Sequence, residues 1–180
     1  MNIFLWSIES RDRNGIYAHK WPGFTISPVH LRPEGRGRLS LKSPDPFSAP
    51  KIEFKFLETA YDVDAMLYGM RLARKIAEQP ALKPYIAEEV QPGQGVAGDE
   101  AMIEDIRNRG VSNLHPVGTC RMGTGSDAVV DARLRVHGLK GLRVADASIM
   151  PQVVGGNTNA PSIMIGEKCA AMTLEDARRS

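Results

Sequence analysis

Apolar side chains recur at helical spacing in three parts of the chain. The first set follows Asp62 and consists of Val63, Met66, Leu67, Met70, Ala73 and Ala77. Intervals of three and four residues are those of one helix face, with Asp62 as the expected N-cap. The pattern ends at Gln79, because a residue that precedes proline is biased away from helical backbone.

Two further helices are predicted on the same grounds. In the second, Asp99 is the expected cap, Met102, Ile103 and Ile106 form the apolar face, and Gly110 ends the helix. The third covers residues 161–172, where apolar positions again have helical spacing.

Alternating patterns predict strands elsewhere. Residues 25–31 and 38–42 are rich in β-formers, and the segment 33–37 between them is expected to connect them as a hairpin. Ile52, Phe54 and Phe56 alternate with charged residues, which is typical of a sheet covered on one side. Residues 130–136 and 142–145 are also expected to be strands. The fold class predicted is α+β, an antiparallel sheet with helices packed on one face.

Composition narrows the class of protein. The chain has 180 residues, of which 42% are apolar and 24% charged, and this is enough for one globular domain. Its 23 basic and 21 acidic residues give a net charge of +2, which argues against a nucleic-acid partner. The two cysteines form no ligand-spaced motif, so we expect free thiols and no metal site. The sequence shows neither a secretory leader pattern nor a transmembrane segment. We expect a cytoplasmic protein, with association at the membrane periphery as the alternative.

The residues with the strongest chemical signal are His115 and Asn157. His115 opens a Pro/Gly-rich loop over residues 115–123, and Asn157 lies in a second polar loop with Asn159 and Pro161. A histidine and an amide brought together by the fold would provide a base and a hydrogen-bond donor. From local sequence alone, however, a histidine before proline is more often a loop or capping residue than a catalytic one. An asparagine that follows two glycines, like Asn157, is likewise more often a turn residue.

Asp146 ends the apolar run at 142–145 and is followed by Ala147. A carboxylate at the carboxyl end of a strand lies where open sheets bind cofactors. The same aspartate could cap the following turn instead.

Several segments resemble the C-terminal part of the glucose-methanol-choline (GMC) family of flavoprotein alcohol oxidoreductases. Residues 30–37, His-Leu-Arg-Pro-Glu-Gly-Arg-Gly, resemble a family segment that usually has serine at Gly35, and residues 73–77, Ala-Arg-Lys-Ile-Ala, resemble a family helix. The His115 loop and residues 146–161 are the most specific parts. The resemblance runs from about Trp21 to Met172, in family order, and is closest to choline-dehydrogenase-type members.

The resemblance implies a set of roles. His115 matches the active-site base, and Asn157 matches a second catalytic position that is histidine in some members and asparagine in others. Asp146, Ala147, Asn159 and Pro161 match positions beside the flavin. The implied reaction is oxidation of a primary alcohol to an aldehyde, with FAD as the hydride acceptor and oxygen or a quinone-like compound as the final electron acceptor.

The resemblance also implies an incomplete enzyme. The family has a Gly-x-Gly-x-x-Gly turn near its N-terminus, whereas the glycines at 93–98 and 118–123 of this chain do not follow an apolar strand. We therefore expect the FAD-binding N-terminal half to be a required partner. The predicted divisions are a poorly patterned segment (1–21), a substrate-binding domain (22–137) and a strand, loop and helix that pack on the FAD-binding domain (138–180).

Two alternatives stay open. One is a catalytically silent remnant that acts as a binding or interaction module. The other, a hydrolase based on His115, is weaker because the sequence has no Gly-x-Ser-x-Gly motif.

Overall fold

The structure, a computed structural model, describes residues 1–4, 8–12 and 15–179. Residues 5–7 and 13–14, which belong to the predicted segment 1–21, and Ser180 lie outside the described residues. The chain forms two compact units. The first combines Met1–His30 with Leu57–Val111, and the second combines Leu31–Phe56 with Ser112–Ser180.

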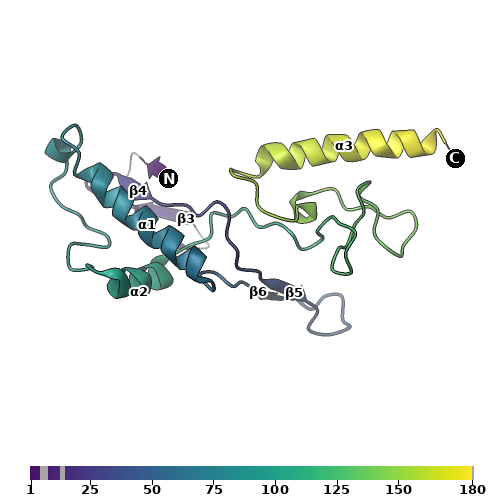
Figure 1. The fold of residues 1–180 in the computed structure, drawn as a ribbon, viewed down its shortest axis with the longest axis horizontal. Coiled ribbons are helices and arrows are strands. Elements are labelled where there is room, and N and C mark those ends of the chain that lie inside the picture. Colours follow the sequence, from purple (N-terminus) through teal and green to yellow (C-terminus); the bar gives the residue numbers. More distant parts are fainter. Residues whose placement is uncertain (5–7, 13–14, 180) are drawn as a thin grey trace. The chain divides into compact units, whose positions relative to one another are not determined.

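Helices and short strands are distributed over both units (Figure 1). The first unit contains β1 (Asn2–Phe4), β2 (Ile8–Asp12), β3 (Gly15–Ala18), β4 (Thr25–Ser27), α1 (Ala60–Ala77), the 3-10 helix η1 (Lys83–Tyr85) and α2 (Asp99–Arg109). The second contains β5 (Arg38–Ser40), β6 (Lys51–Glu53), the 3-10 helix η2 (Ala147–Ile149) and α3 (Asn159–Ala177). The α+β class is confirmed, and every described strand pairing is antiparallel.

The described strands form three two-stranded sheets, β1–β4, β2–β3 and β5–β6. The predicted hairpin between residues 25–31 and 38–42 is therefore wrong. Residues 33–37, the expected hairpin connection, form a loop with internal hydrogen bonds instead. The Arg36 guanidinium donates to the carbonyls of Pro33, Glu34 and Gly35 at 2.8, 3.1 and 3.1 Å. β5 pairs with β6, and a Cβ atom at Gly37 would lie only 2.2 Å from the Glu53 carbonyl oxygen.

The described part of residues 1–21, where the sequence shows little pattern, is largely strand. β1 pairs with β4, with Ile3 opposite Ile26, and β2 pairs with β3. Strands of three to five residues are too short to display a periodicity, and they are stabilised by partners rather than by local preference.

In the first unit, helix α1 begins one turn earlier than predicted. Thr59 is the N-cap, and its hydroxyl accepts a hydrogen bond from the Asp62 amide at 3.1 Å. The predicted cap, Asp62, is buried within the first turn. The α1 helix lies against the residue that follows β4, because a Cβ at Gly69 would meet Pro28 Cβ at 2.5 Å.

The N-cap of helix α2 also differs from the prediction. Gly98, with φ +82°, is the N-cap, and Asp99 is the first helical residue. The predicted end is confirmed, since the Gly110 amide donates to the Ile106 carbonyl at 2.7 Å. Leu67 of α1 and the predicted apolar residues Met102 and Ile106 of α2 form the core of this unit.

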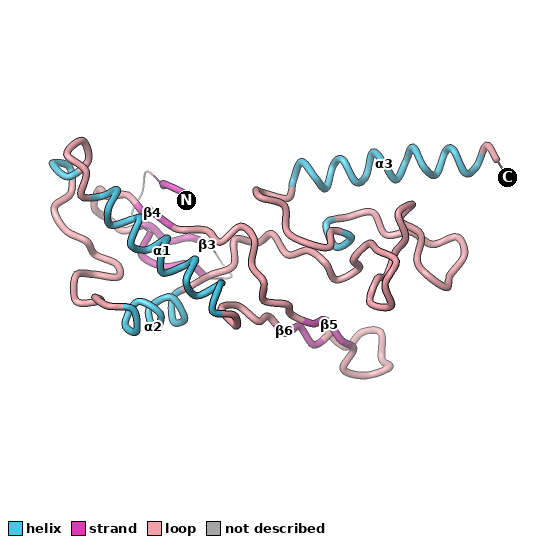
Figure 2. The backbone as a smooth tube through the Cα atoms, in the orientation of Figure 1, coloured by secondary structure: helices cyan, strands magenta, loops and turns pink. Residues whose placement is uncertain are grey.

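The second unit is built largely from loops beside one long helix (Figure 2). Its core consists of Val130, Leu134, Ile149, Met150 and Ile165. The predicted third helix is confirmed and is longer than expected. By contrast, the strands predicted at 130–136 and 142–145 are isolated bridges, Val130 with Val136 and Arg135 with Arg143.

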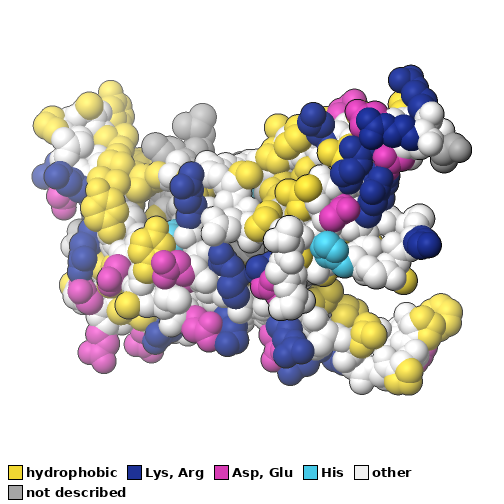
Figure 3. Space-filling model, turned by 45° about the vertical axis from the view of Figure 1, so that its right-hand side comes forward, with side chains coloured by type: hydrophobic (Ala, Val, Ile, Leu, Met, Phe, Trp, Pro, Cys, Tyr) yellow, Lys and Arg dark blue, Asp and Glu magenta, His cyan; other side chains and the backbone are white. Residues whose placement is uncertain are grey.

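The C-terminal half of α3 is held by a group of charged side chains (Figure 3). Asp176 pairs with Arg133 at 2.9 Å and also with Arg135 and Arg143, all three from the loops of residues 131–144. These pairs fasten the helix to the loops at the end opposite to His115. Within the described residues, none of the helices is both long enough and apolar enough to cross a bilayer.

Candidate active site

The loop that carries His115 has two left-handed backbone positions. Leu114, immediately before the histidine, has φ +61°, and Gly118 has φ +90°. Positive φ is sterically unfavourable for leucine, so this conformation requires support from the surrounding structure. Part of that support is local, because the Leu114 amide donates to the Ser112 hydroxyl at 3.1 Å. The turn at Leu114 determines the direction in which the half-buried His115 leaves the backbone.

The segment that follows His115 is fixed to the segment that follows Asp146. The Cys120 amide donates to the Ser148 carbonyl at 3.1 Å, and the Met122 amide donates to the Ile149 carbonyl at 2.8 Å. Ile149 belongs to the core, so both bonds attach the histidine loop to the best-packed part of the unit.

The start of α3 completes this arrangement. Nδ1 of His115 lies 2.9 Å from Oγ1 of Thr158, and the Thr158 amide lies 3.5 Å from the same nitrogen. Thr158 is the N-cap of α3 and is 9% exposed. Because Nδ1 is occupied by these contacts, Nε2 is the ring nitrogen left for a ligand.

The predicted partner Asn157 precedes Thr158 directly, and so lies beside the residue that contacts His115. The side chains of Asn157 and Asn159 are exposed and have no hydrogen-bond partner among the described residues. Both amides are therefore available to a ligand. Pro161 is half-buried at the third position of α3.

Asp146 caps the short helix η2. Its Oδ1 accepts a hydrogen bond from the Ser148 amide at 2.7 Å, while the residue stays exposed. The capping role that the sequence left open is thus realised. The second carboxylate oxygen of Asp146 has no partner in the described part of the chain, and Ala147 beside it is half-buried.

The sequence prediction overlooked Thr158. Its position between two asparagines at the start of a helix indicates only a capping residue. Its contact with His115 joins positions 43 residues apart, so no local pattern could have identified it.

The other histidines have different surroundings. Nε2 of His137 donates to the Gly123 carbonyl at 3.0 Å, and the ring of His19 stacks on Trp21 with centroids 4.1 Å apart. His30 contacts Asp62. Within the described ranges, no group of three or more histidine, cysteine, aspartate or glutamate side chains could hold a metal ion. Cys120 and Cys169 are free thiols.

The glycines at 93, 95 and 98 precede helix α2 but do not form a phosphate cradle. No described strand leads into them. The carbonyls of Gly93 and Val96 accept hydrogen bonds from the Arg74 guanidinium at 3.1 and 2.8 Å. Asp99 and Glu100 place negative charge in the first turn of α2, which disfavours an anion there.

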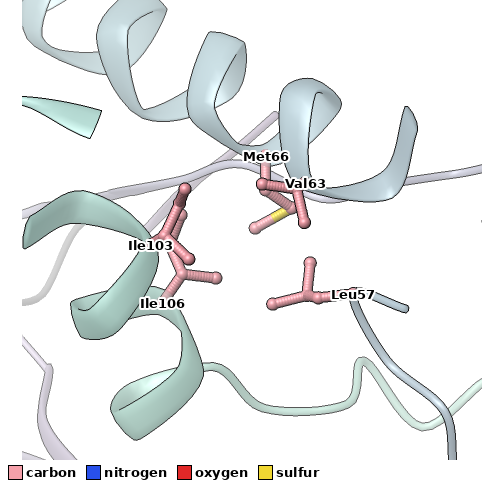
Figure 4. Close-up of a pocket in the computed structure, with 5 residues that line it drawn as sticks. All are labelled: Leu57, Val63, Met66, Ile103 and Ile106. Atoms are coloured by element: carbon pink, nitrogen blue, oxygen red, sulfur yellow. The ribbon is translucent and has the colours of Figure 1, made fainter. Parts of the chain in front are cut away.

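An apolar hollow in the first unit, too narrow to admit a water molecule, differs in chemistry from the His115 site (Figure 4). Leu57, Val63, Met66, Ile103 and Ile106 line it. These side chains point toward one another from α1, α2 and the segment before α1 that holds Leu57, and none can transfer a proton. The hollow is part of the apolar packing between the two helices and is not a candidate site.

The sequence is similar to known proteins of one family. The family model "GMC oxidoreductase" matches residues 33–166, which include every predicted site residue. The alcohol dehydrogenase [acceptor] of Pseudomonas putida is 40% identical over 95% of this chain, and this chain covers 34% of its length. An oxygen-dependent choline dehydrogenase of Escherichia coli O45:K1 is 46% identical over 88% of this chain and 28% of its own length.

Two solved structures are similar in fold. Pyridoxine 4-oxidase from Mesorbium loti has a TM-score of 0.73 and 33% identity, over 78% of this chain and 28% of its own. A fungal aryl-alcohol oxidase has a TM-score of 0.74 and 31% identity, over 92% of this chain and 26% of its own. The chain thus spans about a third or less of the length of these relatives. With the family model matched over most of its length, the chain belongs to the GMC oxidoreductase family.

Proposed function

We propose that this chain supplies the proton-transfer part of the active site of an FAD-dependent alcohol oxidoreductase. The observation that carries the proposal is the His115–Thr158 contact of 2.9 Å, which joins the histidine loop to the loop of Asn157. The contact leaves Nε2 of His115 and the side-chain amide of Asn157 on adjoining segments, and neither has a partner among the residues that the structure describes. A base and a hydrogen-bond donor in that relation suit an alcohol oxygen that loses its proton.

In this proposal His115 takes the hydroxyl proton of the alcohol on Nε2. The Asn157 side-chain NH₂ donates to the same oxygen and stabilises the negative charge that develops there. FAD, when bound, supplies the acceptor for the hydride of the adjacent carbon.

The residues at the start of α3 fit one edge of a flavin ring. The amides of Asn159 and Ala160 are in the first turn, where an α-helix provides no acceptor, and Pro161 has no N–H to compete with them. The ring edge of a flavin carries carbonyl oxygens that such amides can bind. Asp146, Ala147, Asn159 and Pro161 are the residues that we propose to contact it.

We propose that the substrate is a small primary alcohol, because the relatives named above are alcohol and choline dehydrogenases. The second candidate function is an interaction module without catalysis. It is favoured by the apolar side chains that α3 exposes, Ile163 at 61%, Met164 at 53% and Leu174 at 60%.

The first test is retention of FAD. The purified chain is incubated with FAD, passed over a sizing column and examined for flavin absorbance. Retained flavin would show that the chain alone holds the cofactor. A colourless protein would mean that the rest of the enzyme is needed to hold FAD, and the second test supplies it.

In the second test, the rest of the Pseudomonas putida relative is supplied as a separate chain, or this chain replaces the matched third of that enzyme. Alcohol-dependent reduction of a dye that is lost in His115→Ala and kept in His137→Ala supports the enzyme. Activity that survives His115→Ala refutes the proposed base, and a folded, flavin-containing chimera without activity favours the interaction module.

A further inference from the structure

The ribbon formed by β5 and β6 has an apolar face and a polar face. Its register places Leu39 opposite Ile52, and directly opposed side chains lie on the same face. Side-chain direction alternates along a strand, so the pairs on either side of these two residues point to the other face. These pairs are Arg38 with Glu53 and Ser40 with Lys51. The ribbon thus has the pattern of a sheet that is covered on one side.

The apolar face continues beyond the two strands. Leu41 and Phe54 each lie two residues beyond a member of the Leu39–Ile52 pair, and the Phe56 ring stacks on the Phe54 ring with centroids 5.0 Å apart. We call these five side chains the apolar ribbon face. Their exposed fractions are 48% for Leu39, 84% for Leu41, 59% for Ile52, 58% for Phe54 and 62% for Phe56. The apolar ribbon face is therefore largely open to solvent.

The loop that joins the strands, residues 41–50, presents one more aromatic side chain. Phe47 is 94% exposed. Oδ1 of Asp45 accepts a hydrogen bond from the Phe47 amide at 3.0 Å, and the hydroxyls of Ser43 and Ser48 lie 3.0 Å apart. The loop thus fixes the backbone of Phe47 without using its ring. Little conformational freedom would be lost when a partner covers such a side chain.

This ribbon lacks the elements that usually complete a sheet. A two-stranded ribbon is marginally stable alone, and a contiguous exposed apolar surface commonly marks an interaction site. Among the described strands, β5 and β6 pair with each other and with no third strand (Figure 1). This chain covers 34% of the Pseudomonas putida alcohol dehydrogenase and 28% of the Escherichia coli choline dehydrogenase. The larger part of such an enzyme is thus available to cover the apolar ribbon face.

Charge argues against a lipid surface as the occupant. Lipid recognition by a surface segment relies on a dense cluster of lysines and arginines. Residues 38–56 contain four basic and two acidic residues, and Lys51 is already paired with Glu53 at 2.9 Å. An apolar protein surface, which needs no excess of charge, fits the ribbon better.

We propose that the apolar ribbon face is a docking surface for the remaining part of a GMC oxidoreductase, with Phe47 as an additional anchor. The partner covers Phe54 and Phe56 with apolar side chains of its own, and aromatic anchors of this kind dominate interface energies. The proposal rests on the proposed function for the identity of the partner. It concerns association rather than proton transfer, so it can be tested without turnover.

The first test compares thiol labelling in this chain alone and in the Pseudomonas putida chimera. Phe47→Cys and Phe54→Cys report on the docking surface, and Lys51→Cys on the polar face is the matched control. Peptide mass spectrometry separates these positions from Cys120 and Cys169. We expect the two docking positions to react readily in the chain alone and at least about tenfold more slowly in the chimera, because a covered thiol reacts only when its surroundings open. The control should react at similar rates in both.

The second test measures binding of this chain to the rest of the Pseudomonas putida enzyme, supplied as a separate chain. Phe47→Ser and Phe54→Ser should each raise Kd at least about tenfold, and Lys51→Ser less than about threefold. Circular dichroism and the urea midpoint of each variant check that it is folded. If Phe54→Ser alters the fold, Phe47→Ser in the exposed loop carries the comparison.

Three outcomes would overturn the proposal. One is equal labelling of Phe54→Cys in the chain and in the chimera, or equal protection of Phe54→Cys and Lys51→Cys. Another is a dimer of this chain on a sizing column in which Phe54→Cys is already protected, which would assign the surface to a second copy. The third is protection by phosphatidylglycerol vesicles without protection in the chimera.

Failure of the proposed function gives a different result. A chimera that protects Phe54→Cys but keeps its activity in His115→Ala would leave the docking surface standing and refute the proposed base.

Discussion

Nε2 of His30 lies 2.9 Å from Oδ1 of Asp62, and the Asp62 side chain is only 2% exposed. The contact joins the end of the first segment of unit one to the first turn of α1. His30 also packs on the Tyr61 ring, with centroids 5.4 Å apart. The histidine that opens the family-like segment 30–37 is thus a structural residue that satisfies a buried carboxylate.

His30→Ala should therefore destabilise the first unit. The change takes a partner from a buried acceptor, which typically costs about 2 kcal/mol. Urea unfolding followed by circular dichroism measures it. Asp64→Ala, an exposed aspartate of the same helix, is the control and should change the free energy of unfolding by less than about 0.5 kcal/mol. Equal effects of the two substitutions would contradict the structural role of His30.

Ile165 and Ile163 provide a second matched pair on helix α3. Ile165 is 5% exposed and belongs to the core, whereas Ile163 is 61% exposed. Ile165→Ala should cost about 2–4 kcal/mol through lost burial and a residual cavity, and Ile163→Ala much less. Urea unfolding of the second unit measures the free-energy cost of each substitution. Should Ile163→Ala be as costly as Ile165→Ala, Ile163 would be buried as well, which would contradict its position on the exposed face of α3.

Stability at low pH should depend on Asp176. Hydrogen bonds from Arg135 and Arg143 and the charges of Arg133 and Arg135 outweigh partial burial and lower the pKa of Asp176 from 3.8 to about 2. Because the folded pKa lies below the unfolded one, this contribution is complete above the unfolded value and is lost as the pH falls toward about 2.

The measurement is the thermal midpoint as a function of pH. Asp176→Asn should lower the midpoint near neutral pH and weaken its fall between about pH 4 and pH 2. Glu175→Gln, whose side chain is 53% exposed, is the control and should keep the pH dependence of the unmodified chain. An unchanged acid limb in Asp176→Asn would show that another carboxylate is responsible.

Arg74 should hold the loop that precedes α2. Its guanidinium contacts both oxygens of Glu89 at 2.9–3.1 Å and donates to two loop carbonyls. Lysine cannot reproduce these forked contacts. Arg74→Lys should therefore increase hydrogen exchange at the Val96 amide roughly fivefold, equivalent to about 1 kcal/mol. Arg71→Lys, which changes an exposed ion pair to Asp99, should have little effect, and the reverse order would refute this account.

Asn157 should contribute to catalysis if the proposed function holds. Asn157→Ala removes one donor to the substrate oxygen, and kcat/KM of the Pseudomonas putida chimera should fall about 100-fold. Steady-state kinetics with flavin content as a reference measure the effect. Asn108→Ala, exposed on α2, is the control. A change in KM alone would indicate that Asn157 binds the alcohol without stabilising the developing charge.

The three helices and the catalytic candidates could be predicted from the amino-acid sequence. The spacing of Met102 and Ile106 identified the buried face of α2, and Gly110 marked its end, because helical periodicity and end signals are local properties. The motifs around His115 and Asn157 likewise pointed to the family that the comparisons then showed.

The pairing of these parts could not be predicted from local sequence, because it depends on long-range contacts. The β4 strand pairs with β1 rather than with β5, because strands of three residues depend on partners from distant parts of the chain. The buried Asp62 and the turned hydroxyl of Thr158 depend equally on distant histidines. Local pattern determines an element and its exposed face, whereas contacts between side chains many residues apart are settled by packing.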